Sequence, residues 1–263
     1  MYIEQHSRYQ NKANNIQLRY DDKQFHTTVI KDVLLWIEHN LDQSLLLALN
    51  GSDSLYLDGL MLTYTSGFTW IPLYVGLLYL VIKNNETMLQ ILWAVLCFAI
   101  CIFISDLLAD GIVKPLVHRY RPCSDPSIKY IVDIANGYRS SDFSFYSAHA
   151  SNTMSIAMLS LLIVRNRLFT VFMISWSLLN CYTRLYLGMH YPSDIIVGLA
   201  LGMVVGYLTY LLYRVVFVKI SQNPNYISTY YSKTGYALSD INVVLLLIVI
   251  CLLYGIIKAL YIC

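Results

Sequence analysis

Charged residues are scarce in this chain of 263 amino acids, since Asp, Glu, Lys and Arg make up only 13% of it while 57% is hydrophobic. A soluble domain carries about 25% charged residues. The composition therefore excludes an ordinary soluble enzyme and indicates a polytopic membrane protein. The net charge of +2 is too small to favour a nucleic-acid partner. Tyrosine is abundant instead, with 23 copies, which is typical of side chains at a membrane–water interface.

Patterns of metal ligands and disulfides are also missing. The six cysteines are scattered along the chain and show neither zinc spacing nor a disulfide framework. We expect most of them to be small buried hydrophobic side chains, while a bridge between Cys123 and Cys181 stays open. We predict no metal ion and no other cofactor.

The first 32 residues are polar and lack the apolar core of a signal peptide. Residues 33–50 are apolar at both ends but carry a polar centre, which would be costly in hydrocarbon. Their apolar side chains share one helical face, namely Leu34, Ile37, Leu41, Leu45 and Ala48. We predict an amphipathic helix lying on the membrane, with a true membrane span as the alternative.

Long apolar runs follow, most of them near the ~20 residues that a bilayer requires. Five of them form a predicted core, and a sixth closes the chain: 60–82, 88–112, 150–164, 168–187, 193–217 and 241–262. The expected fold is all-α, a transmembrane helix bundle of five core spans and a C-terminal sixth, with an interfacial N-terminal helix. The predicted domains are a tail with this helix (1–59), a membrane core (60–219), and a linker with the last helix (220–263).

The short loops suggest an orientation. Basic residues gather on one side of the bundle: Lys83, Arg165, Arg167, Arg214, Lys219 and Lys233. The positive-inside rule places that side in the cytoplasm. The loops 113–149 and 183–194 then face the periplasm or exterior.

Those two outer loops hold most of the ionisable residues that flank the apolar runs, and such residues are functional candidates. Arg121 and Arg184 can each offer a forked, permanently charged donor to phosphate oxygens. Lys114 adds a compact positive charge, and Asp110, one helical turn earlier, is placed to hold it. We predict that the three cations bind phosphate.

A nucleophile and an acid accompany these cations. His190 and Asp194 are four residues apart, with Pro192 between them at the start of a span. A carboxylate bonded to one imidazole nitrogen leaves the other free to attack, so His190 is the candidate nucleophile and Asp194 its orienting partner. His149 is the candidate general acid.

Two further groups complete the predicted site. Ser147 and the backbone amide of Ala148 lie near a helix N-terminus, which suits an anion. A metal at His149 and His190 is disfavoured, because no third ligand is evident and nearby cations would repel a divalent ion. His118 lies close to the site, but its position gives it no role.

Three segments together resemble a known family. Lys114-x6-Arg121-Pro122, Ser147-x-His149 and Arg184-x5-His190-x3-Asp194 are similar to the three motifs of the type 2 phosphatidic acid phosphatases, the lipid phosphate phosphatases. The resemblance covers about 114–194, and the bundle from about 60 to 217 looks like the membrane-embedded bacterial branch.

The resemblance implies a metal-independent phosphatase that works through a phosphohistidine. Lys114, Arg121 and Arg184 would then bind phosphate. His149 would protonate the leaving group, and His190 would attack phosphorus with support from Asp194. Two positions depart from the family pattern. Ala148 stands where Gly is usual, and Thr183 where Ser is usual, which affects loop geometry and substrate preference more than activity.

Several functions fit these residues. The leading hypothesis is a lipid phosphatase of a bacterial inner membrane that acts on an envelope lipid, such as undecaprenyl diphosphate or a lipid A phosphate. Phosphatidylglycerol phosphate and phosphatidate are alternative substrates. A phosphoryl transferase with the same pocket, and a non-enzymatic protein that binds an anionic lipid, are alternative functions.

Overall fold

The computed structural model describes residues 40–140, 142–220 and 230–262. The chain divides into two compact units, Met1–Leu45 and Leu46–Cys263. Only residues 40–45 of the first unit are described, and they are helical. Residues 33–39 of the predicted interfacial helix, and the tail before them, therefore lie outside the described residues, while residues 40–49 are helical.

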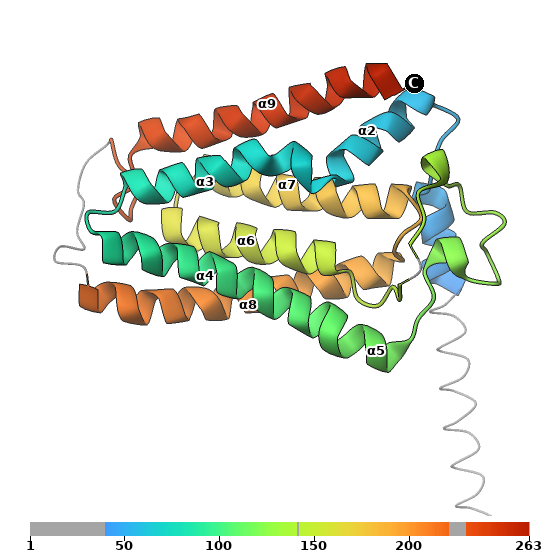
Figure 1. Ribbon diagram of the computed structural model, residues 1–263, viewed down its shortest axis with the longest axis horizontal. Helices are drawn as coiled ribbons and strands as arrows, with labels where there is room; N and C mark the ends of the chain where they lie inside the picture. The colour runs from blue at the N-terminus through green and yellow to red at the C-terminus, as the bar shows by residue number, and fades with distance from the viewer. Residues whose placement is uncertain (1–39, 141, 221–229, 263) are drawn as a thin grey trace, which may run out of the picture. The chain divides into compact units, whose positions relative to one another are not determined.

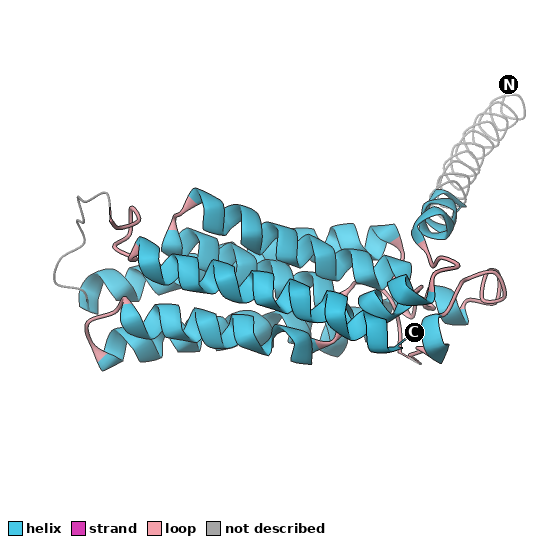
Figure 2. Ribbon diagram, turned by 90° about the horizontal axis from the view of Figure 1, so that it is seen from above, coloured by secondary structure: helices cyan, strands magenta, loops and turns pink. Residues whose placement is uncertain are grey.

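The second unit is built from helices. Apart from one isolated bridge between Tyr231 and Ala237, its described residues form no β-structure, as Figure 2 also shows. After the helical residues 46–49 the elements are α2 (Leu55–Thr65), η1 (Gly67–Trp70), α3 (Ile71–Lys83), α4 (Met88–Asp106), η2 (Leu107–Val113), α5 (Lys114–Val117), η3 (Pro122–Ser124), η4 (Ala135–Gly137), α6 (Ala148–Val164), α7 (Arg167–Tyr186), α8 (Pro192–Ile220) and α9 (Leu238–Ile262) (Figure 1). The predicted all-α fold is confirmed.

Three of the described helical segments are long and apolar enough to cross a membrane: Met88–Ser124, Pro192–Ile220 and Leu238–Tyr261. The pair α2 and η1–α3 passes the same test together and is bent by 66°. α6 is apolar but only 17 residues long. α7 has 20 residues, among them buried polar side chains such as Asn180 and Arg184.

The bend falls inside the predicted span 60–82. Ser66 has an extended backbone and ends α2, which frees carbonyl groups that hydrocarbon cannot satisfy. Two side chains just beyond the break satisfy them. Thr69 Oγ1 donates to the carbonyl of Thr63 at 2.6 Å, and Trp70 Nε1 donates to that of Tyr64 at 2.8 Å. The break in the helix therefore leaves the carbonyls of Thr63 and Tyr64 with hydrogen-bond partners.

α6 and α8 pack closely because α8 carries small residues along one face. Glycines recur every four residues on it, at Gly198, Gly202 and Gly206. A Cβ at these positions would lie 2.5 to 2.7 Å from carbonyl oxygens of Ser147, Ser151 and Ser155 on the α6 side. Glycine repeats of this kind let helix backbones approach within membranes. The contact fixes α6 and α8, whose first turns hold His149 and Asp194, against each other.

Long-range hydrogen bonds bring together chain segments at the end of the bundle where α3, α6 and α8 finish. Gln90 Nε2 donates to the carbonyl of Ile220, and Thr234 Oγ1 donates to that of Val164. The long loop between α5 and α6 and the α7–α8 turn lie at the opposite end (Figure 1). The predicted site residues occur at that second end.

Candidate active site

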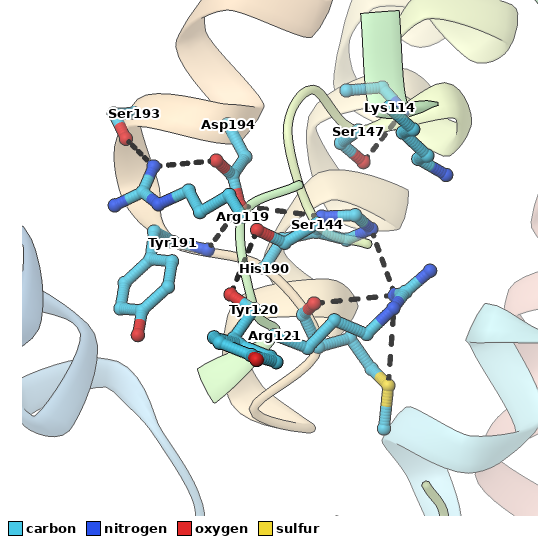
Figure 3. A network of polar contacts seen from close by, with 12 residues as sticks. Lys114, Arg119, Tyr120, Arg121, Ser144, Ser147, His190, Tyr191, Ser193 and Asp194 are labelled. Carbon is cyan, nitrogen blue, oxygen red and sulfur yellow. Dashed lines mark hydrogen bonds and ion pairs between the residues drawn. The ribbon is translucent and has the colours of Figure 1, made fainter. Parts of the chain in front are cut away.

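The candidate site is assembled from the segments that meet at the loop-rich end of the bundle (Figure 3). Residues 118–121 follow α5, residues 142–147 precede α6, and residues 187–191 join α7 to α8. Ser144 ties the first two segments together, because its N–H donates to Arg119 O at 2.8 Å and its Oγ to Tyr120 O at 3.1 Å. The Ser147 N–H, which donates to Asp194 O at 3.2 Å, joins the starts of α6 and α8.

Lys114 lies where the helix of residues 88–117 changes its winding. Residues Leu107–Val113 form a π-helical stretch between α4 and α5. Such stretches occur frequently at functional sites. The predicted contact is present, since Lys114 Nζ lies 2.5 Å from Asp110 Oδ1. Asp106 does not join them, and its Oδ1 instead accepts from Asn152 Nδ2 at 2.6 Å.

Arg121 is only 5% exposed and is held by backbone carbonyls. Its Nε donates to Asp142 O at 3.0 Å and its Nη1 to Met189 O at 3.3 Å. The same Nη1 lies 3.3 Å from His190 Nε2 (Figure 3). Within the described residues no carboxylate forms an ion pair with Arg121.

Arg184, in the last turn of α7, is 3% exposed. Its Nη1 donates to Thr65 Oγ1 at 2.8 Å and to the Tyr138 hydroxyl at 3.2 Å. Its buried Nε has no hydrogen-bond partner among the described residues. A buried cation without a counter-charge is costly. Arg184 therefore has the properties of an anion ligand.

His190 is 1% exposed and lies among these cations. Burial is the main reason that its pKa lies well below the usual 6.5. The positive charges of Arg184, Arg121 and Lys114 lower the pKa further. Arginine can only donate hydrogen bonds, so the electron pair of His190 Nε2 accepts from Arg121 Nη1. The ring is therefore neutral, with its proton on Nδ1.

Asp194 is fully buried and lies beside His190. Its Oδ2 is 3.6 Å from His190 Nδ1, which is beyond normal hydrogen-bond length. The same Oδ2 accepts from the Tyr191 N–H at 2.9 Å, so the carboxylate also closes the first turn of α8. The predicted pairing of His190 with Asp194 is present as a contact, not as a direct hydrogen bond.

Arg119 belongs to this group and was not among the residues predicted from the sequence. Its Nη1 donates to Asp194 Oδ1 and to Ser193 Oγ, both at 2.7 Å (Figure 3). Its guanidinium also lies over the Tyr191 ring, 4.0 Å from the ring centre. The signal available in the sequence was a third basic residue inside the Lys114–Arg121 interval, at a membrane border where isolated charges are costly.

The start of α6 supplies the remaining predicted groups. Ser147 is the N-cap, and its Oγ accepts from the Ala150 N–H at 3.4 Å. The amide of Ala148 lies in the first turn, where N–H groups have no partner within the helix. His149 has an exposed side chain. Its pKa is lowered from the usual 6.5 to about 3, first by desolvation and then by the positive charge of Arg184.

Other predicted candidates lie apart from this arrangement. The His118 ring packs edge-on against Phe143, with ring centres 4.6 Å apart. Cys123 and Cys181 are both free thiols. Across the described ranges, no three His, Cys, Asp or Glu side chains come together to form a metal site.

Comparison with known proteins places the chain in a family. The family model described as the PAP2 superfamily matches residues 89–217. A lipid A 4'-phosphatase of Bacteroides thetaiotaomicron is 35% identical over 174 residues, which are 66% of this chain and 77% of that protein. The chain belongs to the PAP2 superfamily. The predicted family is thereby confirmed, and this PAP2 chain is a multi-pass membrane protein and a lipid phosphatase.

Two further proteins are similar to this PAP2 chain, one in its fold and one over a short stretch of sequence. The crystal structure of a transmembrane PAP2 type phosphatidylglycerolphosphate phosphatase from Bacillus subtilis has a TM-score of 0.52, at 21% identity. The matched region covers 71% of this chain and 89% of the Bacillus subtilis chain. The likeness supports the fold alone. A stretch of 47 residues, 18% of this chain, is 96% identical to the Transposon Tn10 TetD protein of Escherichia coli and covers 34% of it.

Proposed function

We propose that the enzyme removes phosphate from a membrane lipid through a phosphohistidine at His190, without a metal ion. One observation carries this proposal. Two buried arginines that have no carboxylate partner among the described residues lie around a neutral histidine. A phosphate group would supply the missing negative charge and would meet the histidine electron pair at the same place.

His190 is the nucleophile. Its Nε2 carries the electron pair, and Arg121 Nη1, at 3.3 Å, occupies the position beside it. Because arginine prefers the bidentate geometry of phosphate oxygens, the incoming phosphate takes over this donor and frees Nε2 for attack. The low pKa of His190 keeps the ring neutral, and therefore nucleophilic, at physiological pH.

Asp194 and Arg119 position the nucleophile. As Nε2 forms its bond to phosphorus, the imidazole becomes positively charged, and the carboxylate beside Nδ1 stabilises that charge. Arg119 holds Oδ1 of the same carboxylate, which leaves Oδ2 directed at the histidine and the Tyr191 amide. Arg119 thus acts through Asp194 and is a positioning residue.

The other groups bind phosphate and move protons. Lys114, Arg121 and Arg184 neutralise the phosphate oxygens, with help from the Ser147 hydroxyl and the Ala148 amide. The bound phosphate anion offsets the cations that lower the pKa of His149, so His149 takes up the proton that it later donates. His190 Nε2 attacks phosphorus, the bond from phosphorus to the lipid oxygen breaks, and His149 protonates that oxygen. Water then attacks phosphorus, His149 accepts a proton from the water, and the P–N bond breaks to release phosphate and neutral His190.

The substrate we favour is a bacterial envelope lipid, a lipid A phosphate before undecaprenyl diphosphate, because the relative from Bacteroides thetaiotaomicron is named for lipid A. The basic loops at the far end support an inner-membrane protein whose site faces the periplasm. Phosphatidylglycerol phosphate and phosphatidate are second candidates, and a phosphoryl transferase with the same residues is the alternative activity.

Phosphate release from a panel of lipids tests this proposal. Purified protein would be given lipid A, undecaprenyl diphosphate, phosphatidylglycerol phosphate and phosphatidate, with His190→Ala in parallel. We expect release from one envelope lipid, unchanged by EDTA, inhibited by vanadate and lost in the variant. Release only when an acceptor lipid is added would favour the transferase, and release that depends on added metal would contradict the mechanism.

A further inference from the structure

A second charged pocket lies at the end of the bundle opposite the candidate active site. It has a volume of about 600 Å³ and is lined by Arg165, Asn166, Arg167, Thr170, Val171 and Lys233. Three of its six lining residues are cations and none is acidic. The α6–α7 turn and the segment before α9 contribute to it, so residues far apart in the sequence converge there.

Contacts within the protein hold Arg165 and the turn that carries Lys233. Arg165 Nη2 donates to the Tyr210 hydroxyl on α8 at 3.1 Å. Lys233 lies in a turn that is fixed on both sides, because Ser232 N–H donates to Tyr236 O and Thr234 Oγ1 donates to Val164 O. The positive charges are therefore brought to one place by the fold.

An apolar groove continues from the charged pocket along α7. It has a volume of about 270 Å³ and is lined by Trp70, Val171, Phe172, Ser175, Trp176, Leu179, Ile248 and Leu252. Val171 lines both the pocket and the groove. From Val171 to Leu179 the groove follows α7 for roughly 12 Å, which is comparable to the ~15 Å depth of one leaflet of hydrocarbon.

A charged pocket followed by an apolar groove matches a ligand with an anionic headgroup and an apolar chain. A turn between two membrane helices lies at headgroup depth, and the groove descends from it between α7 and α9, which pack next to each other. We propose that this pocket and groove bind an anionic phospholipid, with its phosphate among Arg165, Arg167 and Lys233 and an acyl chain along α7. Basic pockets between membrane helices bind anionic headgroups in this way.

Retention of lipid by the full-length protein tests the proposal. The protein would be placed in nanodiscs of phosphatidylcholine containing a minor fraction of phosphatidylglycerol, extracted, and examined by native mass spectrometry. We expect one phosphatidylglycerol molecule to be retained in preference to phosphatidylcholine. In the triple variant Arg165→Gln, Arg167→Gln, Lys233→Gln its affinity falls roughly tenfold or more, since each cation near an anionic surface contributes several-fold.

A matched variant separates a site from general charge attraction. Lys83→Gln, Arg214→Gln, Lys219→Gln removes three exposed cations from the same end of the bundle but none from the pocket, so retention should change by less than about threefold. Val171→Trp, which fills the junction of pocket and groove, should also release the lipid.

Three results would overturn the proposal: equal loss of lipid in both triple variants, equal retention of phosphatidylcholine, or binding of inorganic phosphate that phosphatidylglycerol does not displace. Phosphatase activity in pure phosphatidylcholine, measured in parallel, should be the same for all these variants. The test is therefore independent of the proposed catalytic mechanism.

Discussion

Cations gather at both ends of the bundle, but they differ in how deeply they are buried. At the active-site end Arg121 and Arg184 are 5% and 3% exposed, and backbone carbonyls and hydroxyl groups hold them in place. At the far end Arg165, Arg167 and Lys233 are exposed. Exposed charges at a membrane border cost little free energy and set the orientation of the protein or bind lipid headgroups. A buried cation destabilises the fold by several kcal/mol unless an anion compensates it.

In this protein burial, more than charge, distinguishes the cations of the active site from the cations that set the orientation in the membrane. Arg184 Nε is a buried donor with no partner in the described part of the chain, and a native structure tolerates such a group when a ligand satisfies it. Changes in the buried site should therefore have larger effects on activity than matched changes elsewhere in the bundle.

Replacing Arg184 by lysine should have the largest effect. An ammonium group cannot reproduce the planar fork that reaches Thr65, Tyr138 and phosphate together. We expect kcat/KM for lipid dephosphorylation to fall by roughly 10²- to 10³-fold while the protein still inserts and folds. Arg214→Lys, an exposed cation at the far end, is the matched control and should retain full activity.

Arg119→Gln should have the next largest effect. The carboxylate of Asp194 loses its hydrogen bond to Oδ1 and turns away from His190, so we expect kcat to fall by about 10- to 100-fold, the range of outer-shell partners. KM should change little, because Arg119 does not contact phosphate. Arg119→Lys should restore part of kcat. Equal losses in KM and kcat, or unchanged activity, would remove Arg119 from the mechanism.

The pH dependence gives a third test. His190 must be neutral to attack, and its pKa lies below 6.5, so the acid limb of the pH profile of kcat/KM should lie below pH 6.5. Lys114→Gln removes a nearby positive charge and so raises the pKa of His190. The acid limb of the activity that remains in this variant should therefore move to higher pH. A limb above pH 6.5 in the wild type would contradict the assignment of a neutral, buried His190.

The same pKa shift affects stability. The unfolded chain binds a proton at His190 near pH 6.5 and the folded chain only at lower pH. Folding stability should therefore decrease as pH falls below 6.5.

The helix contact beneath the site should give the smallest effect on activity and a clear effect on stability. A Cβ at Gly202 would lie 2.5 Å from the carbonyl oxygen of Ser151, so Gly202→Ala must push α6 and α8 apart, at a cost of about 1–3 kcal/mol. We expect a Tm several degrees lower in detergent. Gly67→Ala, where nothing lies within 4 Å of the added Cβ, is the control and should unfold at the wild-type temperature.

The helices and most of the candidate site residues could be predicted from the sequence, because they depend on side-chain type and on spacing along the chain. The apolar runs predicted helices whose observed bounds differ by a few residues, and the interval from Asp110 to Lys114 predicted their contact. The bend at Ser66 was not predictable, because it depends on Thr69 and Trp70 folding back onto α2. Arg119 was missed because its partner, Asp194, lies 75 residues away in sequence.

The residues outside the family match are 1–88 and 218–263. The first interval contains the segment predicted as an interfacial helix, and a new compact unit begins at Leu46. The predicted boundaries at 59/60 and 219/220 stay predictions.

Trapping of the phosphorylated enzyme would test the central claim most directly. Protein mixed with a lipid carrying labelled phosphate would be quenched in alkali, which preserves a P–N bond, and digested for mass spectrometry. The account predicts label on the peptide that contains His190, at a level that falls as phosphate is released, and no label in His190→Ala. Release of phosphate by an enzyme that is never labelled at His190, or release that persists in His190→Ala, would contradict it.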